Sequence, residues 1–367
     1  MSQMKSLKLD IPFLISTLLL FLVGLLIFFS ASLGLLAKQH LSYAGIVWKQ
    51  IIIGGGIGML ALFFTSNFDY KKWRKYAFYL FLFGIFLNLI VFTPQIGYTH
   101  GGATRWIALG SFTFQPSEFL RLATVLYFAV WLSSMKNKVN TFNYGFIPLC
   151  IILAITESIL LLQHDTDLVI AVALMGMFIV AGGKIKHLLL LFFILVISLT
   201  ALVYTRPYVR DRINTFLHPA SNPLGSGYQI QQSLIAIGSG GFYGKGFGQS
   251  IQKFNYLPEP MGDSIFAVAG EEFGFIGTVG LILLFLVFAM RGLKIASNSR
   301  DSFGTILATG IVLITIGQVF TNIGAMVGIL PLTGVPLLFV SQGGTSLIFA
   351  LGATGIVLNI SKQRVLK

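Results

Sequence analysis

The sequence predicts an all-α polytopic membrane protein with ten transmembrane helices, folded as a single membrane domain over residues 1–367. Of its residues, 55% are hydrophobic and only 10% are charged, whereas a soluble domain carries about 25% charged residues. The basic residues also collect on alternate connections between apolar runs. A net charge of +13 would suggest nucleic acid in a soluble protein; here it reflects the enrichment of Lys and Arg in cytoplasmic loops.

Ten apolar runs are long enough, or nearly so, to cross a bilayer, which requires roughly 20 residues. The first is too long for the hydrophobic region of a cleaved signal peptide, so we expect it to be retained. The expected spans are residues 11–37, 45–65, 76–93, 117–133, 145–162, 168–183, 187–205, 264–290, 303–327 and 341–361.

The distribution of basic residues sets the orientation of these spans. With the N-terminus inside, sixteen of the 25 basic residues lie on short inner loops or tails, so both termini are predicted to be cytoplasmic. These residues are Lys5, Lys8, Lys71, Lys72, Arg74, Lys75, Lys136, Lys138, Lys184, Lys186, Arg291, Lys294, Arg300, Lys362, Arg364 and Lys367.

Most acidic residues fall on the opposite side, outside the membrane or in the outer half of a span. Glu118 and Arg121 are three residues apart on one expected helix and can pair. Glu157 lies about 9 Å of helix rise below the outer end of its span. Together with Asp165 and Asp167, these residues predict a polar network or an outward-facing cavity. Each acid alone could equally be satisfied by a hydrogen bond between helices.

One long outer connection, residues 206–263, joins the seventh and eighth spans, and a loop of this length is usually functional or disordered. Residues 228–238 have the apolar period of a helix and could lie on the membrane surface. The glycine-rich residues 238–250 resemble a loop that cradles phosphate, although glycine also simply permits close packing. The connection is basic, which favours an anionic ligand or lipid headgroups; its cations include Arg206, Arg210, Arg212, Lys245 and Lys253.

Four carboxylates mark the end of this connection. Glu259 and Asp263 stand in a turn rich in Pro and Gly, and Glu271 and Glu272 follow inside the eighth apolar run. Charges where a chain enters a membrane are costly and usually functional. Asp263 could alternatively serve only as the cap of the helix that follows. His100, His164 and His218 have no metal-ligand spacing, and a single cysteine, Cys150, allows no disulfide within the chain.

Four blocks of sequence resemble the SEDS family (shape, elongation, division and sporulation), which includes FtsW and RodA. FFSAS at Phe28–Ser32 resembles the end of the family's first span, and GATRWIALGSFTFQPSEFLRLA at Gly102–Ala123 resembles its GARRWI…QPSE block. Gly225–Gly277 is similar to the family's long loop and eighth span, including its PExxxDxIFA motif. Asn322–Leu347 is similar to its NIG…SYGGSS block. The resemblance covers nearly the whole chain.

The resemblance implies a peptidoglycan glycosyltransferase that polymerises lipid II on the outer face of the bacterial cytoplasmic membrane. It implies a partner class B penicillin-binding protein, the transpeptidase, within the division or elongation machinery. The wording of the motifs favours FtsW over RodA, and therefore a place at the septum. Two other functions stay open: a lipid II flippase, and a non-catalytic scaffold for the penicillin-binding protein.

The family's motifs also assign residues. Asp263 takes the place of the Asp of PExxxDxIFA and is the expected catalytic base. Glu259, the Glu of the same motif, and Arg105 and Trp106 of the RW motif are expected to bind substrate. Arg210, Arg212, Lys245 and Lys253 are candidate contacts of the lipid diphosphate. A divalent cation, Mg²⁺ or Mn²⁺, could share that task. Glu118, Arg121, Glu157, Asp165, Glu271 and Glu272 are expected to form a polar network.

Two departures from the family pattern stand out. QPDxGT becomes QHDTDL, which places His164 where the family has Pro, and Arg121 replaces a Lys. Arginine is always charged and favours paired carboxylate contacts, so proton release at position 121 is not expected.

Overall fold

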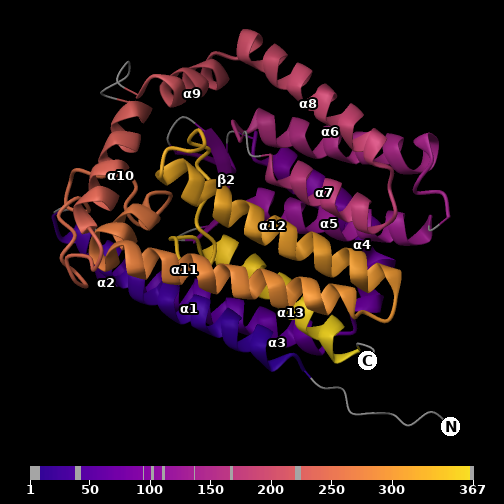
Figure 1. Cartoon of the computed structure of the whole chain (residues 1–367), viewed down its shortest axis with the longest axis horizontal. Helices are drawn as coiled ribbons and strands as arrows, with labels where there is room; N and C mark the ends of the chain where they lie inside the picture. Colours follow the sequence, from indigo (N-terminus) through magenta and orange to yellow (C-terminus); the bar gives the residue numbers. More distant parts are fainter. Residues whose placement is uncertain are drawn as a thin grey trace.

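In the computed structural model, the apolar runs form helices that pack side by side into a bundle (Figure 1). The structure describes residues 9–37, 43–93, 95–100, 103–109, 112–135, 137–165, 168–219 and 225–363. Six charged residues used in the prediction of topology and network therefore lie outside the described residues: Lys5, Lys8, Lys136, Asp167, Arg364 and Lys367.

Every predicted span overlaps a helix or a continuous helical segment. The first half of the chain contains α1 (Ile11–Ser32), η1 (Leu33–Ala37), α2 (Tyr43–Lys49), η2 (Gln50–Ile57), α3 (Gly58–Asn67), α4 (Tyr70–Ile90), α5 (Pro116–Ser134), η3 (Phe142–Phe146), α6 (Ile147–Leu162) and α7 (Val169–Val180). The second half contains α8 (Ile185–Thr205), α9 (Pro207–Leu217), α10 (Ser226–Gly240), α11 (Ile265–Ser297), α12 (Ser302–Met326) and α13 (Gly344–Lys362).

Seven helical segments of the described chain are long and apolar enough to cross a membrane, which confirms a polytopic membrane protein. They are residues 11–36, 43–67, 142–162, 185–205, 265–297, 302–326 and 344–362. Helix α7 is a shorter apolar helix. The number ten and the orientation stay predictions.

Three acidic residues begin helices at the end of the bundle where the chain starts. The side chain of Asp10 accepts a hydrogen bond from Phe13 N, and that of Asp301 accepts one from Gly304 N, at 3.1 and 2.7 Å. Asp69 caps α4 through Lys71 N. These carboxylates satisfy backbone donors that a helix leaves free in its first turn.

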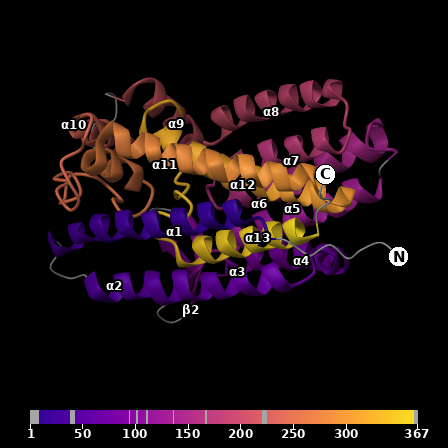
Figure 2. The same cartoon turned by 60° about the horizontal axis from the view of Figure 1, so that its bottom comes forward.

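Helices α12 and α13 form the core of the bundle, and α8 lies at its edge (Figures 1 and 2). In their most apolar stretches, 72% and 83% of the residues of α12 and α13 are buried, against 6% for α8. The beginning of α1 lies beside the end of α13, since Asp10 N donates to Ser361 Oγ at 3.2 Å. Both ends of the described chain are thus on one side of the bundle, as the predicted topology requires.

The connection between α4 and α5 contains a three-stranded antiparallel sheet that the sequence did not lead us to expect. It consists of β1 (Gly97–His100), β2 (Ala103–Leu109) and β3 (Phe112–Phe114), with β2 in the centre. Tyr98 pairs with Trp106, and Ile107 pairs with Phe114. This sheet carries Arg105 to the end of the bundle where Asp263 lies.

The helix predicted at residues 228–238 is present within α10, but it packs against α11 and does not lie alone on a membrane surface. Ile230, Ser233 and Ala236 are buried. At Gly240 an added Cβ would stand 2.0 Å from the carbonyl oxygen of Gly270, so the two helices approach as closely as glycine allows.

Candidate active site around Asp263

Asp263 lies in a tight turn immediately before α11, held by neighbours from other parts of the chain. Asn322 Nδ2 on α12 donates to the carbonyl oxygens of Asp263 and Val335, both at 2.8 Å. Ser341 Oγ donates to Gly262 O at 2.8 Å. The turn is therefore fixed by α12 and by the connection that follows it.

The carboxylate of Asp263 is partly buried and does not serve as the cap of α11, whose N-cap position is occupied by Ser264. Burial raises the pKa of Asp263 to about 6, and the nearby Glu259 adds to the rise. The positive charges of Arg105 and Arg212 lower the pKa of Asp263, whereas the negative charge of Asp165 raises it further. A carboxyl group with this pKa is largely ionised at neutral pH and still basic enough to accept a proton.

Arg105 reaches this turn from strand β2. Its Nε donates to Gln163 O at 3.0 Å and its Nη2 to His164 O at 2.6 Å, which fix the guanidinium group. Gly334 separates it from Asp263: a Cβ added there would lie 3.4 Å from Arg105 Nη1 and 3.5 Å from Asp263 Oδ2. The arginine and the carboxylate thus flank one small space beside Gly334, whose φ of 75° favours glycine.

Helix α9 supplies the second cation. Arg212 is half-buried, and its guanidinium carbon lies 6.0 Å from the ring centroid of Tyr208, one turn earlier on the helix. Its charge is near enough to lower the pKa of Asp263. Arg210 is exposed and two residues away, so it points to a different side of α9. Of the two predicted arginines on α9, Arg212 is the one that lies near Asp263.

Three of the six residues predicted to form a polar network, Glu118, Arg121 and Asp165, contact one another. Arg121 Nη1 lies 2.8 Å from Glu118 Oε1, and Arg121 Nη2 lies 2.8 Å from Asp165 Oδ2, with all three side chains buried. Glu157 is half-buried on α6, the helix that leads to Asp165. Arg121 was expected to favour a bidentate contact with a carboxylate. Instead, its two terminal nitrogens each bind a different carboxylate.

Backbone donors at the end of the glycine-rich residues 238–250, and directly after them, bind carboxylates of the chain itself. Ile251 N and Gln252 N donate to the carboxylate of Glu271 at 3.1 and 3.2 Å, and Ser250 N donates to Glu272 Oε1 at 3.3 Å. These backbone donors are therefore directed at two glutamates of α11.

The structure likewise does not place Lys245 and Lys253 at the site. Lys245 Nζ lies 2.6 Å from Glu271 Oε1. Lys253 is fully buried, and its Nζ donates to Glu272 Oε1, Ser30 Oγ and Gly248 O at 2.7, 3.0 and 2.9 Å. Because an ammonium group has three donors, Lys253 has none left for a diphosphate.

Residues 241–246 provide hydrogen-bond partners for the backbone of α11 at a break in that helix. Gly274 has φ 64°, so the helix is interrupted there, inside an apolar segment. Lys245 N and Gly246 N donate to the carbonyl oxygens of Glu271 and Glu272, both at 3.0 Å. Phe275 N and Ile276 N donate to Gly241 O and Phe242 O. Backbone groups freed by the break are thus satisfied within the protein, as a lipid environment requires.

Trp106 is half-buried on β2 and, as the residue after Arg105, faces the other side of the sheet. Sequence reasoning overlooked Tyr208, His164 and Gln229, whose Nε2 donates to Ser264 Oγ at 3.0 Å. The spacing of Tyr208 and Arg212, four residues apart after a proline, could have indicated one helix face carrying both.

Among the described residues, no group of three or more His, Cys, Asp or Glu side chains is arranged to hold a metal ion. Glu259 and Asp263 are the two carboxylates at the site, and each is a suitable oxygen ligand for Mg²⁺.

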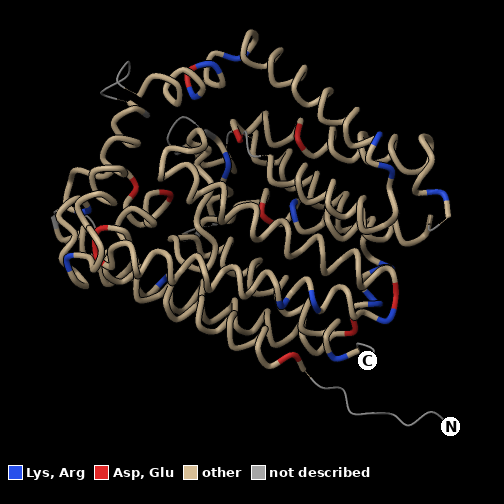
Figure 3. Tube along the Cα trace, in the orientation of Figure 1, with Lys and Arg blue, Asp and Glu red and all other residues tan. Residues whose placement is uncertain are grey.

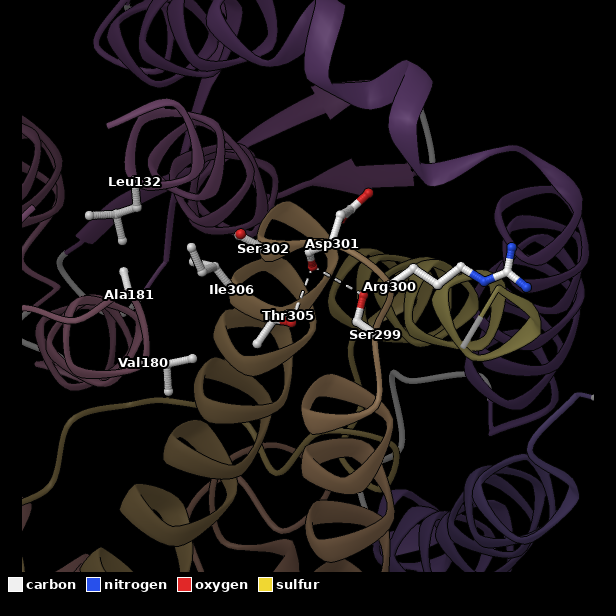
Figure 4. Close-up of a pocket in the computed structure, with 9 residues that line it drawn as sticks. All are labelled: Leu132, Val180, Ala181, Ser299, Arg300, Asp301, Ser302, Thr305 and Ile306. Atoms are coloured by element: carbon white, nitrogen blue, oxygen red, sulfur yellow. Dashed lines mark hydrogen bonds between the residues drawn. The ribbon is translucent and has the colours of Figure 1, made fainter. Parts of the chain in front are cut away.

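A cavity of about 520 Å³ lies at the other end of the bundle, between the ends of α5 and α7 and the start of α12 (Figure 4). It is lined by apolar Leu132 and Val180 and by the polar residues 299–302, with the side chains of Arg300 and Asp301 directed away from Leu132. Along α12, Ser302 and Asn322 are about 30 Å apart. The cavity is therefore remote from Asp263.

Figure 3 shows acidic and basic residues gathered at both ends of the bundle.

Comparison with known proteins identifies similar chains of the same length. A family model described as cell cycle protein, for FtsW, RodA and SpoVE, matches residues 11–366. Stage V sporulation protein E of Bacillus subtilis is 40% identical over 355 residues, covering 96% of this chain and 97% of that protein. A probable peptidoglycan glycosyltransferase FtsW of a Geobacter species is 38% identical over 358 residues, with the same coverage.

Solved structures share the fold. A chain from a peptidoglycan synthase complex that coordinates polymerisation and crosslinking superposes with a TM-score of 0.79 at 24% identity, covering 98% of this chain and 99% of that one. The rod shape determining protein RodA of Thermus thermophilus superposes with a TM-score of 0.69 at 23% identity, with the same coverage.

Proposed function

This chain belongs to the FtsW, RodA and SpoVE family of cell cycle proteins, and on that basis we propose that it is a peptidoglycan glycosyltransferase that polymerises lipid II. The observation that carries the proposal is the position of Asp263 at one end of the bundle, with a raised pKa and two arginines near it. A base and a cationic group are what glycosyl transfer from a lipid diphosphate needs.

The ten helical segments are proposed to span the cytoplasmic membrane with both termini inside. This places the turn of Asp263 at the outer leaflet, where a lipid-linked sugar would present its headgroup. The common side of Asp10 and Ser361 supports an even number of crossings. The short α7 and the more polar α5 would cross within the bundle, largely buried by their neighbours, whereas α4 would expose aromatic side chains such as Tyr79, Phe83 and Phe86 to lipid.

In the proposed reaction, the carboxylate of Asp263 accepts the proton of the acceptor sugar's 4-hydroxyl group as that oxygen attacks the anomeric carbon of the donor. The bond from the anomeric carbon to the diphosphate oxygen breaks, and its electron pair leaves with the lipid diphosphate. A single displacement converts the α-linked donor into a β-linked product. The proton held by Asp263 then passes to solvent.

Arg212 and Arg105 are proposed to stabilise the charge that develops on the departing diphosphate. Both already lie near Asp263 and keep their charge at any physiological pH. Both arginines were among the substrate contacts predicted from the sequence, whereas the predicted Lys245 and Lys253 are paired with Glu271 and Glu272. If a divalent cation takes part, Glu259 and the diphosphate would hold it, and it would add positive charge at the leaving group.

A class B penicillin-binding protein is the proposed partner, supported by the shared fold with a chain of a peptidoglycan synthase complex. Relatives named FtsW and stage V sporulation protein E favour a role in septum formation over one in elongation. A tagged copy expressed in its own cell should therefore concentrate at the septum; uniform labelling of the side wall would contradict this role.

The central experiment is polymerisation of labelled lipid II by the purified protein with its partner, comparing wild type with Asp263→Asn. Loss of a general base should lower the rate by about 10²- to 10⁴-fold. Asp211→Asn, at an exposed position on α9, is the matched control. Full activity of a folded Asp263→Asn protein would refute the assignment. Transfer of lipid II across vesicles without polymer would favour a flippase.

A further inference from the structure

His164 connects three separate parts of the site. Its carbonyl oxygen accepts the 2.6 Å hydrogen bond from Arg105 Nη2. Its ring meets the ring of Tyr208 edge to face, with centroids 4.7 Å apart and planes at 66°, and Tyr208 in turn lies under the guanidinium group of Arg212. One residue of the α6–α7 connection thus contacts strand β2 through its backbone and helix α9 through its side chain.

The backbone at His164 has the left-handed conformation that this double contact needs. Its φ is 60°, which a proline cannot adopt because its ring holds φ near −65°. The resemblance to the family pattern places a proline at this position. Histidine is one of the few residue types with a side chain that tolerates this conformation.

We propose that His164 and Tyr208 are positioning residues that dock α9 on the α6–α7 connection and so hold Arg212 over Asp263 for binding of the donor diphosphate. This inference rests on the proposed function. Tyr208 completes the docking through its hydroxyl group, which donates to Leu161 O at 3.4 Å. Val209 and Thr215 are the buried residues of α9, so the aromatic pair is proposed to add to a small buried surface.

The charges around His164 favour the neutral imidazole that this packing uses. Arg105 on β2 and Arg206 and Arg212 of α9 surround it, and together with burial they lower the pKa of His164. Asp165 is the adjacent acid, and its carboxylate is already bound to Arg121. At neutral pH the ring is therefore uncharged and does not repel Arg212.

The test uses two variants that remove one ring each, His164→Asn and Tyr208→Leu, in the full-length protein with its partner. Asparagine also tolerates a positive φ, so the carbonyl contact to Arg105 is kept. We expect KM for lipid II to rise roughly two- to tenfold, the range that the loss of one aromatic pair corresponds to. Tyr208→Phe, which keeps the ring but loses the hydrogen bond to Leu161 O, should raise KM less than Tyr208→Leu does, and Asn214→Ala on α9 should not change it.

The pH dependence of the rate provides a readout that a merely structural defect would not move. Arg212 lowers the pKa of Asp263, so displacing it should shift the acidic limb of the rate profile to higher pH in both ring variants. Glu259, Arg105 and Asp165, the other charges acting on Asp263, stay in place.

An unchanged KM and an unchanged acidic limb in both ring variants would overturn the inference, provided that Asp263→Asn remains inactive. An active Asp263→Asn protein would instead refute the proposed function. A variant that loses activity equally at every pH, with a lower melting temperature, would show that the pair serves stability only and would also overturn the inference.

Discussion

Arg121 Nη2 and Asp165 Oδ2 lie 2.8 Å apart although the residues are 44 positions apart in the sequence, and the same guanidinium group binds Glu118. This buried triad joins α5 to the connection that carries His164 and, through it, Arg105. Buried charges are costly unless each has its partner. The triad therefore ties the position of the active-site connection to the core of the bundle.

Replacing Arg121 should destabilise the protein strongly. Arg121→Gln leaves Glu118 and Asp165 buried without their cation, which should cost about 3–5 kcal/mol in the free energy of unfolding. Arg121→Lys should lose less, because its single ammonium group can still reach one carboxylate. Thermal unfolding in detergent measures both, with the exposed Arg300→Gln as control. A melting temperature of Arg121→Gln equal to that of wild type would contradict this role.

Polymerisation should depend on pH with an acidic limb near pH 6, because the pKa of Asp263 is about 6 and only its ionised form can accept a proton. Glu259→Gln removes a negative charge that raises this pKa. The midpoint of the limb should therefore move to lower pH in that variant, whatever happens to the maximal rate. Initial rates from pH 4.5 to 8 provide the measurement; a midpoint that stays fixed or rises would exclude Glu259 as a neighbour of the base.

Asp263→Asn should make the folded protein more stable at neutral pH. The pKa of Asp263 is raised from 3.8 to about 6 on folding, so the fold favours the protonated form. Stability is complete below pH 3.8, is lost as the pH rises to 6, and stays reduced above it. Two pKa units correspond to about 3 kcal/mol at most, and partial exposure reduces this. Melting temperatures at pH 7.5 should favour the variant, and the difference should shrink at pH 4.5.

Much of the fold could be predicted from the sequence because hydrophobic length and charge placement act locally. Each apolar run became a helix, and the acids Asp10 and Asp301 turned out to begin helices at the predicted inner end. The sheet around Arg105 could not be foreseen, since its three strands are short and its pairing is set by the helices on either side.

The candidate site could be predicted only as a set of residue types. Asp263 stood out by its motif, but which cations approach it depends on contacts between residues about 50 to 160 positions away. A basic loop near a carboxylate suggested Lys253 as readily as Arg212. The structure distinguishes the two cations. Lys253 forms an ion pair with Glu272, whereas α9 places Arg212 close enough to Asp263 to lower its pKa.

The ion pair of Lys253 and Glu272 gives the last prediction, which separates a structural lysine from a substrate contact. Lys253→Met leaves the carboxylate of Glu272 buried without its cation, so the free energy of unfolding should fall by about 3–5 kcal/mol. The double variant with Glu272→Gln removes both charges and should recover much of that loss. If Lys253 instead bound the diphosphate, the double variant would regain stability but not KM for lipid II. We expect both to recover together, with thermal unfolding and polymerisation kinetics measured on the same preparations.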